Sequence, residues 1–451
     1  MRPSVVTDAV VPRPGPAPRA RPPGADSFFL SAARIVMVGT LLAAPWAFGA
    51  VQAWAWASLA VLAVLSLFLW AIGWAQQGVL KLTWSPLYWL AVAFLLLASI
   101  QLLAGFTFDR MGTRDSLLKL ATDLIFFFLA GQLFSPRVEN NQGVLRLGWA
   151  VTVLALVMSI FAILQFLSSG ALIYWAVKVE SLPFGPYVNH NHYGGLMEML
   201  IPICIACFLS LSAHDLLRVM LEILVLFPLA SLLLAGSRGA LVALLAEVLI
   251  LGWILIRRSP ANTRRSLSAL ALLVIIPAVL VFWWIDSGEV TKRFSSIIPL
   301  NHTQEAPMGA RLVVARDSLR LVRAHPWLGT GLGSFEVAFP RYQSSPTDLV
   351  WDHAHNDYVE ALAETGLIGG LLVISALVLF FRLAFRRLGE RLRHRAEWIQ
   401  IGAAIGCCGL LVHSFVDFNL HIPANAAWFF VLAGIATTKT DSSTQTVKVS
   451  G

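Results

Sequence analysis

Between Gly239 and Ile256 the chain reads GALVALLAEVLILGWILI, and Arg257 and Arg258 follow directly. A bilayer core about 30 Å thick is crossed by a helix of about 20 predominantly apolar residues. Glu247 is the one charged residue in this stretch. The segment therefore predicts a transmembrane helix that ends at a pair of arginines.

The whole chain shares the apolar character of this segment. Of its 451 residues, 57% are hydrophobic and 13% are charged, whereas a soluble domain carries about 25% charged residues. The net charge of +8 does not indicate nucleic-acid binding, because the arginine runs within 257–265 and 382–395 directly follow apolar segments. That placement is typical of the cytoplasmic loops of membrane proteins. We therefore expect an all-α integral membrane protein that binds no nucleic acid.

Twelve windows are apolar and long enough to cross the membrane. They are 30–50, 54–74, 85–105, 116–135, 147–168, 193–211, 218–235, 239–256, 266–285, 359–381, 398–415 and 422–438. The sequence thus predicts about 12 transmembrane helices, nine of them within residues 28–285 and three within 359–438.

The distribution of Lys and Arg places both termini in the cytoplasm, because these residues concentrate in the loops that such an orientation makes cytoplasmic. Residues 1–27 hold seven Pro and four Arg, a composition typical of a disordered tail, and 439–451 form a second cytoplasmic tail. Residues 286–358 form one large outer loop between the ninth and tenth helices. Within it, 311–325 has the apolar spacing of an amphipathic helix, which Pro326 ends.

The histidines are unevenly distributed in this topology. Those expected on the outer side are His190, His192, His302, His325, His353, His355, His413 and His421, and only two others fall inside. This asymmetry indicates that polar chemistry takes place on the outer face.

Four polar clusters lie on the outer side, each next to a predicted helix end. They are Asn189-His190-Asn191-His192, Ser237-Arg238-Gly239, Arg311 with Asp352-His353-Ala354-His355-Asn356-Asp357, and His413 with Asp417, Asn419 and His421. Helix N-termini attract anions, and arginine offers a forked donor that suits phosphate oxygens. The outer face is therefore suited to bind a phosphate-bearing headgroup.

Structural roles compete with functional ones at several of these positions. Arg238 also fits an interfacial anchor, and Asp357 also fits the N-cap of the tenth helix. The pair His353 and His355 beside carboxylates is suggestive of zinc, but no Cys accompanies it, and the sequence predicts no metal. Glu364 lies on one helix face with Glu360 and either orients a histidine or is solvated.

From about 185 to 434 the chain resembles the superfamily of O-antigen ligases and O-antigen polymerases. The resemblance is carried by NHNHYGG at 189–195, SRGA at 237–240, Arg311 ahead of HPWLGTGLGSF at 325–335, HNDY at 355–358 and ETGLIG at 364–369. The order and spacing of these motifs around one large outer loop make the combination specific, whereas the first five helices match by topology only.

The resemblance implies a metal-independent, inverting glycosyltransferase of the bacterial inner membrane that works without a cofactor at the periplasmic face. Its donor would be an undecaprenyl diphosphate-linked glycan, and its acceptor a glycan, a lipid A core or a protein. Arg238 and Arg311 match the arginines that hold the donor diphosphate, and His355 matches the histidine that activates the acceptor hydroxyl. The further predicted substrate-binding residues are Asn189, His190, Asn191, His192, His353, Asn356, Asp357, Glu364, His413, Asp417 and His421.

These roles agree with general chemistry. Fixed cations stabilise the charge that develops on a departing diphosphate, and a neutral imidazole with an ordinary pKa of about 6.5 can take the acceptor proton. His353 is a second candidate base. Ligase and polymerase both remain open, and the segment 413–425 is similar to members linked to exopolysaccharide assembly.

Two alternatives belong to other classes of protein. A transporter or flippase would carry its functional polar residues near the membrane midplane, where the candidates are Lys119, Asp123 and Glu247. A non-catalytic scaffold of an envelope complex would leave the outer histidines without a chemical role.

Overall fold

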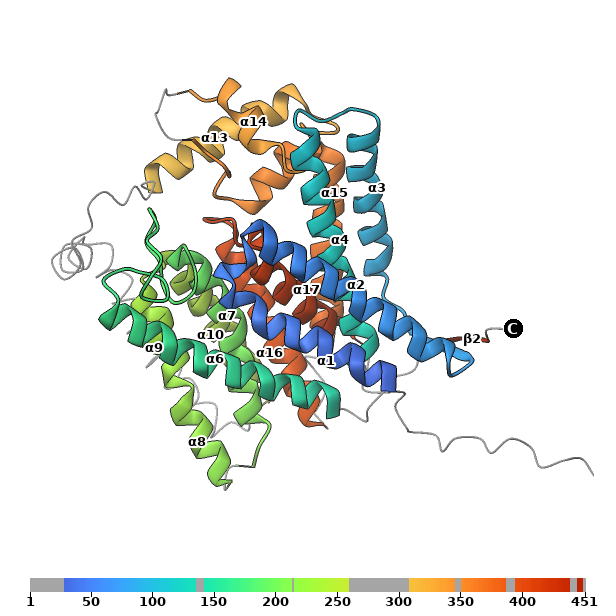
Figure 1. Ribbon diagram of the computed structural model, residues 1–451, viewed down its shortest axis with the longest axis vertical. Coiled ribbons are helices and arrows are strands. Elements are labelled where there is room, and N and C mark those ends of the chain that lie inside the picture. The colour runs from blue at the N-terminus through green and yellow to red at the C-terminus, as the bar shows by residue number, and fades with distance from the viewer. Residues whose placement is uncertain are drawn as a thin grey trace, which may run out of the picture.

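The computed structural model describes residues 28–134, 142–212, 215–258, 308–344, 350–386, 394–438 and 444–448. This part of the chain is a helical bundle (Figure 1). Its elements are α1 (Phe28–Ala43), η1 (Ala44–Trp46), η2 (Phe48–Ala50), α2 (Ala53–Ala75), β1 (Val79–Thr83), α3 (Leu87–Leu103), α4 (Arg110–Leu133), α6 (Gln142–Ser168), α7 (His190–Leu209), α8 (Leu216–Leu224), α9 (Leu226–Ala235), α10 (Arg238–Arg258), α13 (Met308–Ala324), α14 (Phe335–Ala338), η3 (Phe339–Arg341), α15 (Asp357–Ala384), α16 (Arg395–His413), η4 (Asn419–His421), α17 (Pro423–Thr437) and β2 (Thr444–Lys448).

Within the described residues, nine helical segments are long and apolar enough to cross a membrane, and α3 and α17 are shorter apolar helices. Together they account for every predicted window except 266–285, which lies outside the described residues. The multi-pass helical fold is therefore confirmed. The count of twelve, and with it the place of the large loop between the ninth and tenth helices, stays a prediction.

Helix α7 is the central helix of the bundle, because it is buried along most of its length. Helix α16 packs closely against it. A Cβ atom on Gly402 would lie 2.7 Å from the carbonyl oxygen of Pro202, and one on Gly406 would lie 2.5 Å from that of Met199. Small residues at these positions allow the two backbones to approach, as is common between membrane helices.

The loops that were predicted to share one side of the membrane lie at one end of the bundle. Tyr187, which precedes α7, donates a hydrogen bond to Asn425 at the start of α17 (2.8 Å). Thr107, between α3 and α4, lies directly against Gly331. At the opposite end, β1 pairs antiparallel with β2, so that the C-terminal segment 444–448 lies beside the α2–α3 connection. The side of the membrane that each end of the bundle faces stays a prediction.

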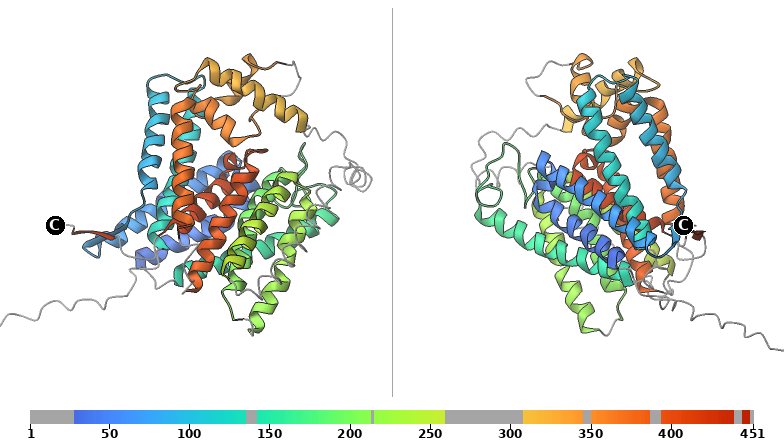
Figure 2. Two further views of the ribbon diagram at one scale, coloured as in Figure 1. Left: turned by 180° about the vertical axis from the view of Figure 1, so that it is seen from behind. Right: turned by 45° about the vertical axis from the view of Figure 1, so that its right-hand side comes forward.

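A separate layer covers one end of the bundle (Figure 2). This layer, here called the cap, consists of residues 308–344 and 350–365. Val314, Phe335, Phe339, Trp351 and Ala354 form its apolar core. Helix α13 covers most of the predicted helix 311–325 and ends just before Pro326. It packs through Val314 and Leu321, whereas Leu312 and Leu319 are exposed.

Helix α15 consists of two helices joined at Gly366, whose φ of 65° and ψ of −167° are open to glycine but not to other residues. The glycine-rich segment 329–333 is packed against this kink. Gly331 donates from its backbone N–H to the carbonyl of Glu364 (2.9 Å), and Leu367 donates to that of Pro326 (2.7 Å). The kink places 357–365 in the cap and leaves the rest of α15 to run along the bundle beside α3 (Figure 1).

Candidate functional site

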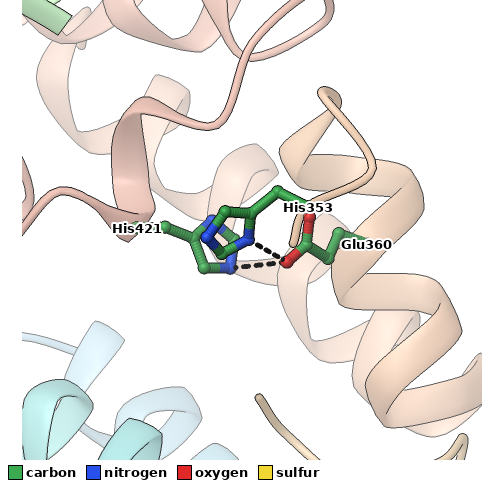
Figure 3. A group of neighbouring side chains, drawn as sticks. All are labelled: His353, Glu360 and His421. Atoms are coloured by element: carbon green, nitrogen blue, oxygen red, sulfur yellow. Dashed lines mark hydrogen bonds and ion pairs between the residues drawn. The ribbon is translucent and has the colours of Figure 1, made fainter. Parts of the chain in front are cut away.

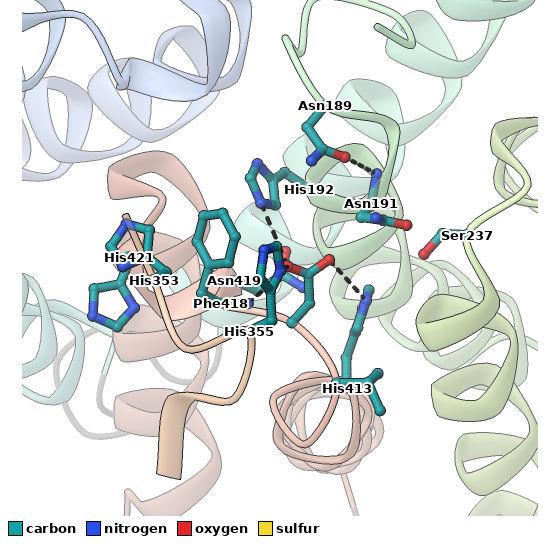
Figure 4. A network of polar contacts seen from close by, with 12 residues as sticks. Asn189, Asn191, His192, Ser237, His353, His355, His413, Phe418, Asn419 and His421 are labelled. Carbon is teal, nitrogen blue, oxygen red and sulfur yellow. Dashed lines mark hydrogen bonds and ion pairs between the residues drawn. The ribbon is translucent and has the colours of Figure 1, made fainter. Parts of the chain in front are cut away.

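The site is built around Asp417, a carboxylate that is 1% exposed in the loop between α16 and α17. Oδ1 of Asp417 lies 3.6 Å from Nδ1 of His355 and 3.9 Å from Nε2 of His192. Its Oδ2 lies 3.8 Å from Nη1 of Arg311 and 4.0 Å from Nε2 of His413. Figure 4 shows the three histidines around this point. The fold thus brings together residues from α7, α13, α16 and the loop before α15.

Asp417 is held as an anion. Burial alone would raise its pKa, but the adjacent His355 and the charges of His192, His413 and Arg311 hold the pKa well below its ordinary value. A buried carboxylate surrounded by donors orients them. Asp417 therefore attracts these side chains by its charge, at distances of 3.6 to 4.0 Å that are longer than hydrogen bonds.

Arg311 reaches from the cap to the bundle. Its Nη1 donates to the carbonyl of Val416 (3.1 Å), and its Nε has no hydrogen-bond partner among the described residues. The bond to Val416 holds one edge of the guanidinium. Because 15% of the side chain is exposed, its other N–H groups can still donate hydrogen bonds to a ligand. This contact with the bundle is the reason that Arg311 is mostly buried.

The start of α10 lies directly against the site. A Cβ atom on Gly239 would lie 2.3 Å from Cδ2 and Nε2 of His413. Only glycine at this position lets the histidine ring lie against the helix backbone. Arg238, the first residue of α10, therefore begins its helix beside the cluster.

The motif at 189–195 begins α7. Asn189 is the N-cap, and its side chain accepts from the backbone N–H of Asn191 (2.8 Å). His190 contacts the carbonyl of Ala235 through Nδ1 (2.7 Å), which ties α7 to the turn before α10. Of the three buried polar residues in this first turn, His192 is the one that approaches Asp417.

Gly195, in the same motif, lies where packing leaves no room for a side chain. A Cβ atom there would lie 2.1 Å from Oδ1 of Asn419, whereas one on Gly39, in α1, would meet nothing within 4 Å. We expect Gly195→Ala to lower the stability by about 1–3 kcal/mol, since added volume in a packed interior forces displacement.

Thermal unfolding of the purified protein in detergent checks this, with Gly39→Ala as the matched control, which should lose no stability. Equal melting temperatures for the two variants would contradict the contact between Gly195 and Asn419.

The sequence missed Glu198, the partner of His413. Nδ1 of His413 lies 3.0 Å from Oε2 of Glu198, and both side chains are fully buried. The signal available was a lone carboxylate in an otherwise apolar span, which ordinarily marks a functional or paired residue. The pair fixes the ring of His413 so that its other nitrogen faces Asp417.

Phe418 was also missed, and it divides the polar site in two. Its ring centroid lies 4.8 Å from that of His192 and 4.9 Å from that of His355. The ring of His353 stacks on it at 4.3 Å. His355 therefore points toward Asp417, and His353 lies in a second cluster beyond the phenyl ring (Figure 4).

This second cluster contains His353, Glu360 and His421 (Figure 3). Oε1 of Glu360 lies 2.7 Å from Nδ1 of His353 and 3.2 Å from Nε2 of His421. Nδ1 of His421 lies 3.0 Å from Oδ1 of Asp357. Burial would lower the pKa of His421, but the charges of Glu360 and Asp357 outweigh burial and raise it to about 10.

The segment before α15 corrects two interpretations. His353 and His355 do not face a common point as a metal pair, because they lie on different sides of Phe418. The N-cap of α15 is Asn356, whose Oδ1 accepts from the N–H groups of Tyr358 (3.1 Å) and Val359 (3.0 Å). Asp357 is instead free to accept from His421.

The remaining predicted residues have the following places. Nδ2 of Asn356 donates to the carbonyl of Phe415 (2.9 Å), which joins the cap to the loop after α16. Glu364 is buried and accepts from the backbone N–H of Phe335 (3.0 Å), so its contacts lie inside the cap. Its predicted contact with substrate stays a prediction.

His355 has a left-handed backbone, with φ of 50°. This conformation is uncommon for a residue other than glycine, and it persists where the surrounding structure enforces it. Here the enforcing contacts are Ala354, which donates to Glu360 (2.7 Å), and the cap of α15 at Asn356. Backbone strain of this kind clusters at active sites.

Fold and site together define a multi-pass membrane protein whose polar residues converge at one end of its helices. Residues 223–374, about a third of the chain, match the model of a protein family described as O-antigen ligase. This segment of the chain is therefore similar to the O-antigen ligase family.

The matched segment includes Arg238, Arg311 and His355. It does not include the start of α7 or the segment 413–421, although the fold brings both to the same site. A search of the curated proteins found no match to this chain.

Proposed function

We propose that this protein transfers a glycan from undecaprenyl diphosphate to an acceptor hydroxyl at the periplasmic face of the bacterial inner membrane. The observation that carries the proposal is the approach of Arg311 and His355 to one buried anion, Asp417, beside the start of α10. Both termini would then lie in the cytoplasm.

The donor diphosphate binds between the start of α10 and the cap. Arg238 and Arg311 hold its oxygens, and the N-terminus of α10 adds the positive end of its dipole. As the bond between the anomeric carbon and the diphosphate breaks, negative charge grows on the leaving oxygens, and fixed cations stabilise it. This step needs no metal and no cofactor. The polyprenyl tail extends into the bilayer.

His355 acts as the general base. A proton on its Nδ1 is favoured by the carboxylate of Asp417, 3.6 Å away, which leaves Nε2 of the neutral ring to accept a proton. The acceptor hydroxyl gives its proton to Nε2, its oxygen bonds to the anomeric carbon, and undecaprenyl diphosphate departs with the bonding electron pair. A single displacement inverts the anomeric configuration. Asp417 orients the ring, as a carboxylate does in hydrolase triads.

The other polar residues shape the substrate site. We assign Asn189, His190, Asn191 and His192 to the donor side, at the start of α7, and His353, Asn356, Asp357, His413 and His421 to the walls around His355. Acceptors with the required hydroxyl are a lipid A core, a second lipid-linked repeat or a protein. The first makes the protein a ligase in lipopolysaccharide biosynthesis, and the second makes it a polymerase of O-antigen or exopolysaccharide.

A transporter or flippase is favoured by one observation only. Glu247 is buried in the middle of α10, and its carboxylate oxygens have no hydrogen-bond partner among the described residues. The convergent residues, in contrast, lie at helix ends and in loops, which suits chemistry at the membrane surface better than transport through the midplane.

Reconstituted protein tests these functions directly. Purified protein is incubated with an undecaprenyl diphosphate-linked glycan and, separately, with lipid A core, further lipid-linked repeats or a protein acceptor. Glycosylated lipid A core or protein indicates a ligase, and longer lipid-linked chains indicate a polymerase. Movement of the labelled lipid across a liposome membrane without transfer to any acceptor would refute the proposal in favour of a flippase.

A further inference from the structure

The cluster of His353, Glu360 and His421 supplies no reacting group to the transfer step proposed above, although two of its members belong to the walls assigned to the substrate site. It lies beyond Phe418, and its three donor atoms, two imidazole nitrogens and one carboxylate oxygen, lie within 4.8 Å of one another. Both nitrogens point at the same oxygen of Glu360 (Figure 3). The three side chains come from two different loops and a helix. We therefore asked which ligand would bind between their donor atoms.

The donor set matches that of zinc. Two imidazoles and one carboxylate bind zinc in many proteins, with water in the fourth position of a tetrahedron. Ligand atoms about 2.1 Å from the ion lie about 3.4 Å from each other. The separations of 2.7 and 3.2 Å from Glu360 are close to that value, so a small outward movement of the side chains accommodates the ion.

The residues behind the donors are also those of a metal site. Nδ1 of His421 faces Oδ1 of Asp357 at 3.0 Å, which leaves Nε2 directed at the cluster. Metal-binding histidines commonly donate their second N–H to a carboxylate, which fixes the tautomer and the ring orientation. Oε2 of Glu360 accepts from the backbone N–H of Ala354 (2.7 Å), so Oε1 is the oxygen that remains for a metal.

The geometry points to a divalent transition-metal site, occupied by zinc, in which Nδ1 of His353, Oε1 of Glu360, Nε2 of His421 and one water are the ligands. His353 and His421 are 25% and 30% exposed, which provides an entry path. The ion joins the segment before α15 to η4 and holds His353 against Phe418. Phe418 separates the ion from His355. The competing state is a metal-free one in which an imidazolium of His421 bridges the two carboxylates.

Zinc content of the full-length protein decides between these states. The protein is purified in detergent through a tag that contains no histidine, stripped with a chelator, incubated with zinc chloride and desalted. Metal analysis should give about one zinc per chain for the unaltered protein, and at least tenfold less for His421→Ala and for Glu360→Gln. His325→Ala is the matched control, because His325 contacts Tyr342 in a different part of the cap, and it should keep its zinc.

Two further measurements keep the test independent of folding and of catalysis. Cobalt(II) in place of zinc should give the visible absorption of a four-coordinate site in the unaltered protein and in His325→Ala but not in Glu360→Gln. Chelation should lower the melting temperature of the unaltered protein and leave that of Glu360→Gln unchanged. Zinc content equal in all variants, or absent from the unaltered protein, would overturn the site and leave the proposed transfer untouched.

Discussion

Arg311→Ala is expected to slow glycan transfer by about 100- to 1,000-fold, the loss that follows removal of one fixed donor to a developing anion. The side chain is anchored by Asp417 and the carbonyl of Val416, so its remaining donors meet the diphosphate without reorganisation. Arg311→Lys should recover part of the rate, because a lysine keeps the charge but not the forked geometry. Transfer is measured with the undecaprenyl diphosphate-linked glycan and whichever acceptor supports the reaction.

Arg316→Ala is the matched control for this effect. Arg316 lies on the same helix, is exposed, and is separated from Arg311 by more than one helical turn. Its substitution should leave the rate within about twofold, since surface charges ordinarily contribute little. If Arg316→Ala and Arg311→Ala reduced transfer equally, general attraction of anions to the cap would explain the loss, and the diphosphate would not be bound by Arg311.

His355→Gln is expected to slow transfer by about 100- to 10,000-fold, the range for loss of a general base. The contacts of Ala354 and Asn356 that enforce the left-handed backbone at this position do not involve the His355 side chain, so the backbone should be retained. Asp417→Asn should also slow transfer, and the double variant His355→Gln with Asp417→Asn should be little slower than His355→Gln alone. Residues that act as a unit give such non-additive losses.

The control for His355 is His325→Gln, which alters a histidine of the cap that contacts Tyr342. It should transfer at an undiminished rate. Losses that multiply in the double variant would mean that Asp417 does not act through His355. An active His355→Gln variant would show that His355 is not the general base.

Much of the fold follows from local patterns that the sequence displays directly. Eleven of the twelve apolar windows coincide with helical segments of the described residues, because the length of a spanning segment is set by bilayer thickness. Gly236 lies between two such windows and caps α9 with φ of 71°, a backbone that favours glycine. Pro326 ends α13 because proline has no backbone N–H to continue the helix. The break in α15 at Gly366 was not predicted, since glycines in membrane helices more often serve close packing.

The sequence predicted most residues of the site but not which of them contact one another. Arg311, His355, His192, His413 and Asp417 were all chosen from the sequence, and the fold brings them together. Glu198 was overlooked because it reads as one polar residue in an apolar helix, although it pairs with a residue more than 200 positions away. Contacts over such separations leave no local spacing to detect.

By itself, the sequence determined that this protein spans a membrane repeatedly and carries its histidines toward one face, because hydropathy and charge act on each segment independently of the others. Only the tertiary structure decided that His355 belongs with Asp417, and His353 with Glu360 and His421. The physical reason is that Phe418 and a left-handed backbone at His355 separate two side chains that are neighbours in the chain.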